Sequence, residues 1–180
     1  MIKKIVFLGG PSTGKTTLSE ALAKELNTLT VAEYGREYWI THQVNRRLTP
    51  QQLLHIAATQ NKMEDKATAK ANKYLFCDTS AFTTWHFALH YHQQALPELT
   101  QLAKDCWQRY DLVVLCEDDI PYDDTWERSG DANRAEFQAF NRRYLLDNKI
   151  NHIVVSGSLE NRKRSVLDAL NVKTLDFCKE

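Results

Sequence analysis

Residues 9–17 (GGPSTGKTT) contain the pattern G-x-x-x-x-G-K-[ST] residue for residue. This pattern predicts a phosphate-binding loop where a strand leads into it and a helix leaves it. Both conditions are met, because residues 4–8 form a short apolar run and apolar residues recur at helical spacing from Leu18 to Leu26. The chain is therefore expected to bind a nucleoside triphosphate.

Four residues of this loop have particular expected roles. Gly9 and Gly14 permit backbone angles and close approaches that let successive N–H groups converge on a phosphate. Lys15 is expected to reach the β and γ oxygens of ATP, and the Thr16 hydroxyl is the expected Mg²⁺ ligand. The predicted ATP-binding residues are Gly9, Gly10, Pro11, Ser12, Thr13, Gly14, Lys15, Thr16 and Thr17.

Length and charge limit the classes of protein that this chain can form. Its 180 residues fit one α/β domain covering residues 1–180. Lysines and arginines number 23 against 23 acidic residues, so no overall basic field predicts a nucleic-acid or membrane partner. No apolar stretch approaches a bilayer span or a signal sequence, and the four cysteines lack a C-x-x-C pair, so a cytoplasmic location is expected. Oligomeric state stays open.

Predicted strands alternate with predicted helices along the chain. Such alternation favours an α/β fold in which helices flank a parallel sheet of about five strands. Together with the phosphate-loop motif, this makes a P-loop NTPase/kinase fold the expected fold class. The strands are expected at residues 4–8, 28–33, 73–78, 111–116 and 150–155. Further helices are expected from about residue 49, where Thr49-Pro50 gives an N-cap and a first-turn proline, and at residues 82–91, 97–109, 134–147 and 158–170.

Two carboxylates are predicted at the ends of strands. Glu33 and Asp78 follow the second and third predicted strands, and ligands of such sheets lie at the carboxyl ends of the strands. Phosphoryl transfer requires a carboxylate near the acceptor hydroxyl and groups that hold Mg²⁺. Glu33 is therefore the candidate base, and Asp78 a candidate Mg²⁺ ligand. Taken singly, each could instead be a helix-cap charge or a turn former.

Residues 117–134 form an acidic, turn-rich segment before a predicted helix. Arg128 and Arg134 could complement charge on the transferred phosphoryl group when this segment closes as a lid and excludes water. A solvated surface loop is the alternative.

Several motifs resemble, in the same order, the ribosylnicotinamide kinase domain of NadR-type proteins. They are the phosphate loop, the segment 33–38 (EYGREY), the strand end 76–79 (FCDT), Thr83-Thr84, and the Asp123-Asp124 pair before the lid arginines. The resemblance covers residues 4–145. It implies ATP-dependent phosphorylation of the 5′-hydroxyl of nicotinamide riboside, with Mg²⁺, to give nicotinamide mononucleotide in NAD salvage.

The resemblance also implies roles for particular residues. The expected catalytic residues are Lys15, Glu33, Asp78, Arg128 and Arg134, and Thr16 and Asp78 are the expected Mg²⁺ ligands. Because the pyridinium of this substrate suits carboxylates and aromatic faces, aromatic residues near the site in sequence are candidates, including Tyr38 and Trp39. The expected substrate-binding residues are Glu33, Tyr34, Arg36, Asp78, Trp85 and Trp126.

Two departures from the family pattern keep other functions open. Ser80 stands where the pattern has a second aspartate, and the first lid arginine comes one or two residues late, with Trp126 and Glu127 before it. Another nucleoside or small hydroxyl compound therefore stays an alternative acceptor. A regulatory switch that hydrolyses ATP without an acceptor is a further alternative. ADP production that depends on an added nucleoside would distinguish the kinases from the switch.

Overall fold

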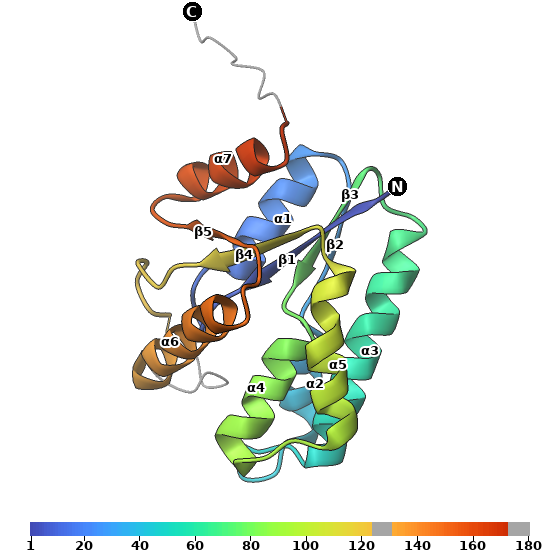
Figure 1. Ribbon diagram of the computed structural model, residues 1–180, viewed down its shortest axis with the longest axis vertical. Coiled ribbons are helices and arrows are strands. Elements are labelled where there is room, and N and C mark those ends of the chain that lie inside the picture. Colours follow the sequence, from blue (N-terminus) through green and yellow to red (C-terminus); the bar gives the residue numbers. More distant parts are fainter. Residues whose placement is uncertain (124–130, 173–180) are drawn as a thin grey trace, which may run out of the picture.

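The computed structural model describes residues 1–123 and 131–172, in which five strands form one sheet (Figure 1). The strand order is β2-β3-β1-β4-β5, and every neighbouring pair is parallel. The strands are β1 (Lys3–Leu8), β2 (Leu29–Val31), β3 (Tyr74–Asp78), β4 (Leu112–Cys116) and β5 (Ile153–Val155). The predicted parallel sheet of about five strands is confirmed.

Helices cover both faces of this sheet (Figure 1). Helices α1 and α7 lie on one face, and α3 to α6 lie on the other. The helices are α1 (Lys15–Glu25), α2 (Tyr34–His42), α3 (Pro50–Thr68), α4 (Ala81–His92), α5 (Pro97–Asp105), a 3₁₀ helix η1 (Cys106–Arg109), α6 (Asp131–Asp147) and α7 (Leu159–Ala169). None of those in the described residues is long and apolar enough to cross a bilayer.

The two-sided burial explains why the strands read as continuous apolar runs. Along β1, Ile5 and Phe7 point into the core shared with α1 and α7, whereas Val6 and Leu8 point into the core shared with α3 to α5. All four side chains are fully buried. Because successive side chains of a strand point to opposite faces, a strand buried on both faces needs apolar residues at every position.

The structure adds one helix and corrects several boundaries. The strand predicted at 150–155 begins at Ile153, and the strand predicted at 28–33 spans only Leu29–Val31. Helix α2 (Tyr34–His42) was not predicted, because it is short and carries Gly35 in its first turn. The Gln60 side chain of α3 accepts a hydrogen bond from the backbone N–H of Tyr34, at 3.0 Å, and so satisfies a donor that the first turn of α2 leaves unbonded. The predicted helix at 97–109 ends as an α-helix at Asp105, and the helix predicted from residue 134 begins at Asp131.

The predicted start of α3 is confirmed in detail. The Thr49 hydroxyl accepts a hydrogen bond from the backbone N–H of Gln52, and the Gln52 side chain accepts one from the Thr49 N–H. This reciprocal pair satisfies two backbone donors that the first turn would leave unbonded.

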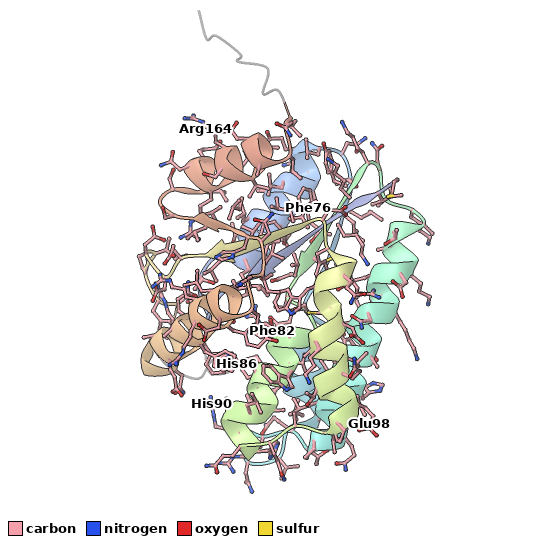
Figure 2. The ribbon with its side chains drawn as sticks, viewed as in Figure 1. Phe76, Phe82, His86, His90, Glu98 and Arg164 are labelled. Carbon is pink, nitrogen blue, oxygen red and sulfur yellow. The ribbon has the colours of Figure 1, made fainter. Side chains whose placement is uncertain are left out.

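A buried histidine joins α4 to α6. The His86 ring stacks on Phe140, with ring centroids 3.8 Å apart, and also contacts Phe137. Figure 2 shows His86 and His90 on the side of α4 nearest α6. Desolvation by burial, with a smaller contribution from the charge of His90, lowers the pKa of His86 from 6.5 to about 3. The folded protein therefore holds His86 neutral.

This burial predicts a loss of stability on mild acidification. Below pH 6.5 the unfolded chain binds a proton at His86 that the folded protein does not bind, so stability falls as the pH falls. Between pH 7 and pH 5 we expect this group to lower the free energy of unfolding by about 2 kcal/mol. Urea titrations of the wild type and His86→Phe over this range measure the difference. The exposed His55→Gln serves as the control, and equal pH dependence in wild type and His86→Phe would contradict the assignment.

Candidate active site

The loop that joins β1 to α1 has the backbone shape of a phosphate cradle. Gly9 and Gly14 have φ values of 147° and 80°, and Ser12 between them has a φ of 58°. A Cβ atom at Gly9 would lie 2.8 Å from the carbonyl oxygen of Cys116, so only glycine fits there. Helix α1 begins directly after Gly14 and has no acidic residue in its first turn. Its N-terminus therefore favours an anion.

The ammonium group of Lys15 lies against the backbone of this loop. Its ammonium nitrogen donates to the carbonyl oxygens of Gly10, at 2.9 Å, and Gly9, at 3.2 Å. The side chain is thus directed back across the loop, on the side where backbone N–H groups and the helix N-terminus face an anion. This placement agrees with the expected role of Lys15 as a phosphate ligand.

Two buried side chains that the sequence analysis did not identify fasten the loop. Gln138 of α6 accepts from the backbone N–H of Gly10 and donates to the carbonyl oxygen of Cys116, both at 3.0 Å. Arg162 of α7 donates to the carbonyl oxygens of Thr13, at 2.7 Å, and Glu117, at 3.1 Å. Neither residue lies in a recognisable motif, so no local sequence signal could have found them.

Thr16 and Asp78, the two expected Mg²⁺ ligands, meet beside the loop. The Thr16 hydroxyl donates to Oδ2 of Asp78 at 2.5 Å. Asp78 lies at the end of β3 and is 1% exposed, and its other oxygen, Oδ1, has no hydrogen-bond partner among the described residues. A buried carboxylate oxygen without a hydrogen-bond partner lowers the stability of the fold unless a ligand binds to it.

These two residues fit Mg²⁺, which is commonly held by one or two carboxylates together with substrate phosphates. Thr16 and Asp78 would hold the ion, and when bound it would neutralise charge on the phosphate oxygens. The described residues contain no group of three or more His, Cys, Asp or Glu side chains that could hold a metal ion without such phosphates.

A cavity of about 870 Å³ extends from the phosphate loop between α2 and α4. Glu33, Arg36 and Trp39 line it from the start and face of α2. The lining residues that the sequence analysis did not place there come from the turn before α3, from α3, α4 and α6, from the residue after β3, and from the segments on either side of residues 124–130. They are Asn45, Arg46, Arg47, Leu48, Leu53, Ile56, Thr79, Phe87, Tyr91, Ile120, Pro121, Asn133 and Phe137.

The structure does not bring all predicted substrate residues to this cavity. Trp85 packs in an aromatic cluster with Phe82, Phe140 and Tyr144 and is not among the lining residues. Tyr34 also lies outside the lining, with its hydroxyl 3.3 Å from the His55 ring. Trp85 and Tyr34 are close to Asp78 and Glu33 in the sequence, but each side chain lies on a helix face that contacts other residues. Asp78 is also outside the lining, because it is buried at the end of β3.

The predicted lid is described in part. Trp126 and Arg128 lie outside the described residues. Arg134 is buried and donates through its guanidinium to the carbonyl oxygens of Ile120, at 2.6 Å, and Asp118. It therefore holds the segment that brings Ile120 into the cavity lining.

Fold and loop together define a protein with the P-loop kinase fold. The chain belongs to the family described as the AAA domain, whose model matches residues 4–162. Over 158 residues it is 32% identical to the trifunctional NAD biosynthesis/regulator protein NadR of Escherichia coli strain K12. This match confirms the resemblance to NadR-type proteins. It covers 86% of this chain, which spans 38% of the length of that relative.

Solved structures share the fold at lower identity. NadR protein in complex with NAD and AMP-PNP gives a TM-score of 0.76, and NadR protein in complex with NR gives 0.77. Both are 22% identical, and each match covers 99% of this chain and 52% of that chain. A deoxyadenosine kinase from M. mycoides gives a TM-score of 0.66 at 13% identity, covering 94% of this chain and all of that one. At these identities the likeness establishes the fold.

The Oδ1 atom of Asp78, which has no hydrogen-bond partner among the described residues, leads to a prediction about Mg²⁺ dependence. Asp78→Asn keeps an acceptor for Thr16 but removes the negative charge. We expect the Mg²⁺ concentration for half-maximal activity to rise about 10- to 100-fold. A Mg²⁺ titration of ATP binding and of turnover measures the shift, with the exposed Asp168→Asn on α7 as the matched control. Unchanged Mg²⁺ dependence would show that Asp78 acts only as a structural acceptor.

Proposed function

We propose that this chain is an ATP-dependent kinase that phosphorylates the 5′-hydroxyl of nicotinamide riboside to give nicotinamide mononucleotide. Residues 1–180 would act as one kinase domain in NAD salvage. The observation that carries this proposal is the continuity of the cavity, which joins the phosphate loop to Glu33 and then to the facing sides of α2 and α4. A donor and an acceptor can therefore occupy one continuous cavity.

In the proposed phosphoryl transfer, Glu33 and Lys15 have separate roles. The 5′-oxygen of the acceptor forms a bond to the γ-phosphorus, while the bond from that phosphorus to the β–γ bridging oxygen breaks and ADP leaves. Glu33 lies at the start of α2, where its carboxylate takes the hydroxyl proton or orients the hydroxyl. Lys15 stabilises the charge on the β and γ oxygens.

The acceptor end offers aromatic surfaces for a pyridinium ring. Trp39, Phe87 and Tyr91 line the cavity beyond Glu33. Aromatic faces attract a cationic ring through their quadrupole. The solved complex of NadR protein with NR supports the same class of acceptor for this chain. Ser80, the departure from the family pattern, is buried at the N-cap of α4 and does not line the cavity.

The lid is part of the proposal. Arg128 is proposed to approach the transferred phosphoryl group when donor and acceptor are bound. Arg134 is proposed to contribute to the same closure. Its contacts with the carbonyl oxygens of Asp118 and Ile120 support a role in carrying the lid segment towards the cavity.

The direct test is phosphoryl transfer with defined acceptors. Purified protein with ATP and Mg²⁺ is given nicotinamide riboside, adenosine, thymidine or no acceptor, and ADP and phosphorylated products are measured by chromatography and mass spectrometry. One ADP for each nicotinamide mononucleotide is expected, with little ADP when no acceptor is present. ADP formation indifferent to nucleosides would support a regulatory switch. Product formed from another nucleoside alone would replace the proposed acceptor.

Glu33 provides the second prediction for this reaction. Glu33→Gln should lower kcat by about 10²- to 10⁴-fold, because the amide cannot accept the hydroxyl proton. Binding of ATP should change far less, since the phosphate loop is intact. Glu37→Gln is the matched control, because Glu37 is exposed on the same helix and does not line the cavity. Normal turnover by a folded Glu33→Gln protein would remove Glu33 as the base.

A further inference from the structure

Thr79, which directly follows β3, has a backbone conformation that threonine rarely adopts. Its φ is 75°, in the left-handed region, and the residue is 4% exposed. In this region the Cβ atom of an L-residue crowds the backbone, and a β-branched residue is an outlier there. Glycine would adopt the same conformation without strain. The fold therefore keeps a side chain at a position where glycine would be less strained, and such positions cluster at functional sites.

The strands on either side of β3 fix the place of Thr79 at the edge of the sheet. Its backbone N–H donates to the carbonyl oxygen of Phe7 at 3.3 Å, so Thr79 lies beside the end of β1, where the phosphate loop begins. On the other side, the last residue of β2 that pairs with β3 is Val31, opposite Cys77. The same register continued for two residues brings Glu33 level with Thr79. In the strand order β2-β3-β1, Thr79 therefore lies between the candidate base and the phosphate loop.

The hydroxyl of Thr79 is available to a ligand. Thr79 lines the cavity, as Thr16 and Glu33 do. Its backbone N–H is bonded to β1, whereas its hydroxyl has no hydrogen-bond partner among the described residues. Asp78, the preceding residue, does not line the cavity, and its carboxylate accepts from Thr16. The conformation at Thr79 thus places a hydroxyl residue in the cavity wall directly after a buried carboxylate.

Two other threonines of the cavity wall differ from Thr79 in this respect. Thr83 and Thr84 line the cavity from the first turn of α4, where their backbone N–H groups donate to the carbonyl oxygen of Ser80. Neither has a positive φ. Helix formation alone therefore explains their conformation, whereas it does not explain that of Thr79.

We infer that Thr79 is a further catalytic residue, whose hydroxyl donates a hydrogen bond to the phosphoryl group as this group passes from ATP to the acceptor. This inference rests on the proposed kinase activity. There Glu33 serves the acceptor hydroxyl and Lys15 the β and γ oxygens, so a donor between them meets the equatorial oxygens of the transferred group. Charge is spread over these oxygens in the transition state. A donor that the backbone already holds in place needs no reorganisation when this charge develops.

The first test removes only the hydroxyl. Thr79→Val keeps the β-branched shape and should lower kcat about 10²- to 10³-fold, as the loss of one preorganised donor to a developing charge does. The KM values for ATP and nicotinamide riboside should change less than about threefold, because the bond is made mainly in the transition state. Thr41→Val is the matched control, since Thr41 is exposed on α2 and does not line the cavity.

A second set of variants separates the hydroxyl from the backbone strain. Thr79→Ser keeps the hydroxyl and should retain most of the wild-type kcat. Thr79→Ala and Thr79→Gly lack the hydroxyl, and both should be slow. Only Thr79→Gly relieves the strain, so it should unfold at a higher urea concentration than Thr79→Ala. Activity should therefore follow the hydroxyl across these variants, whereas stability should follow the backbone.

Binding of a phosphoryl mimic gives a readout that does not depend on turnover. ADP, Mg²⁺ and aluminium fluoride together imitate the group in transfer, and transition-state analogues bind more tightly than substrates. In the presence of nicotinamide riboside, this mixture should raise the Tm of the wild type above the value with ADP and Mg²⁺ alone. The additional rise should be lost in Thr79→Val, and an equal rise in both proteins would overturn the inference.

The outcomes separate this inference from the proposed function. If the wild type phosphorylates no acceptor while ATP still binds, the kinase proposal fails and the role of Thr79 fails with it. If the wild type forms nicotinamide mononucleotide and folded Thr79→Val keeps its kcat, only the role of Thr79 is wrong. The same conclusion follows if the loss appears solely in the KM for the riboside, or if kcat falls in step with stability across the variants.

Discussion

The arrangement of the site depends on β1 pairing with β3 on one side and β4 on the other. Parallel strands end at the same edge of a sheet, so the loop after β1 lies between the segments that follow its two neighbours. This pairing brings Thr16, just beyond the loop, against Asp78 at the end of β3, and brings Gly9 against Cys116 at the end of β4. These contacts join residues more than 60 positions apart, and the backbone hydrogen bonds of the sheet hold them together.

Buried polar side chains then fix the loop within this frame. Gln138 and Arg162 come from the last two helices, and both satisfy backbone groups of the loop or of the segment after β4. Their donors and acceptors are removed from water, so losing one partner would leave the other group buried and unbonded. The C-terminal third of the chain thereby preorganises an N-terminal loop, which a phosphate ligand needs if it is to bind without reordering the backbone.

The residues that line the cavity near the phosphate loop differ in chemistry from those that line it farther away. Near the loop, Lys15 and Thr16 line the cavity, and Thr16 is hydrogen-bonded to the buried Asp78 behind it; in the proposed function this end takes the phosphates and the metal ion. Farther along α2 and α4, aromatic rings line the cavity, and in the proposed function they contact the base of the acceptor. Glu33 lies between these regions, where an acceptor hydroxyl would meet the donor. Along each of these helices, successive lining residues are about one turn apart, so they follow the cavity away from the loop.

The sequence by itself determined the phosphate-loop pattern, the alternation of strands and helices apart from α2, the parallel sheet, and the place of Asp78 at a strand end on the same edge as the loop. These follow from contiguous residues or from strand ends, whose positions a parallel sheet fixes in advance. Only the tertiary structure decided that Trp85 packs among other rings, that α2 forms at all, and that Gln138, Arg162 and the 44–47 turn reach the site. Such placements depend on which face of a helix meets which neighbour across many intervening residues, and no local pattern of polarity encodes that choice.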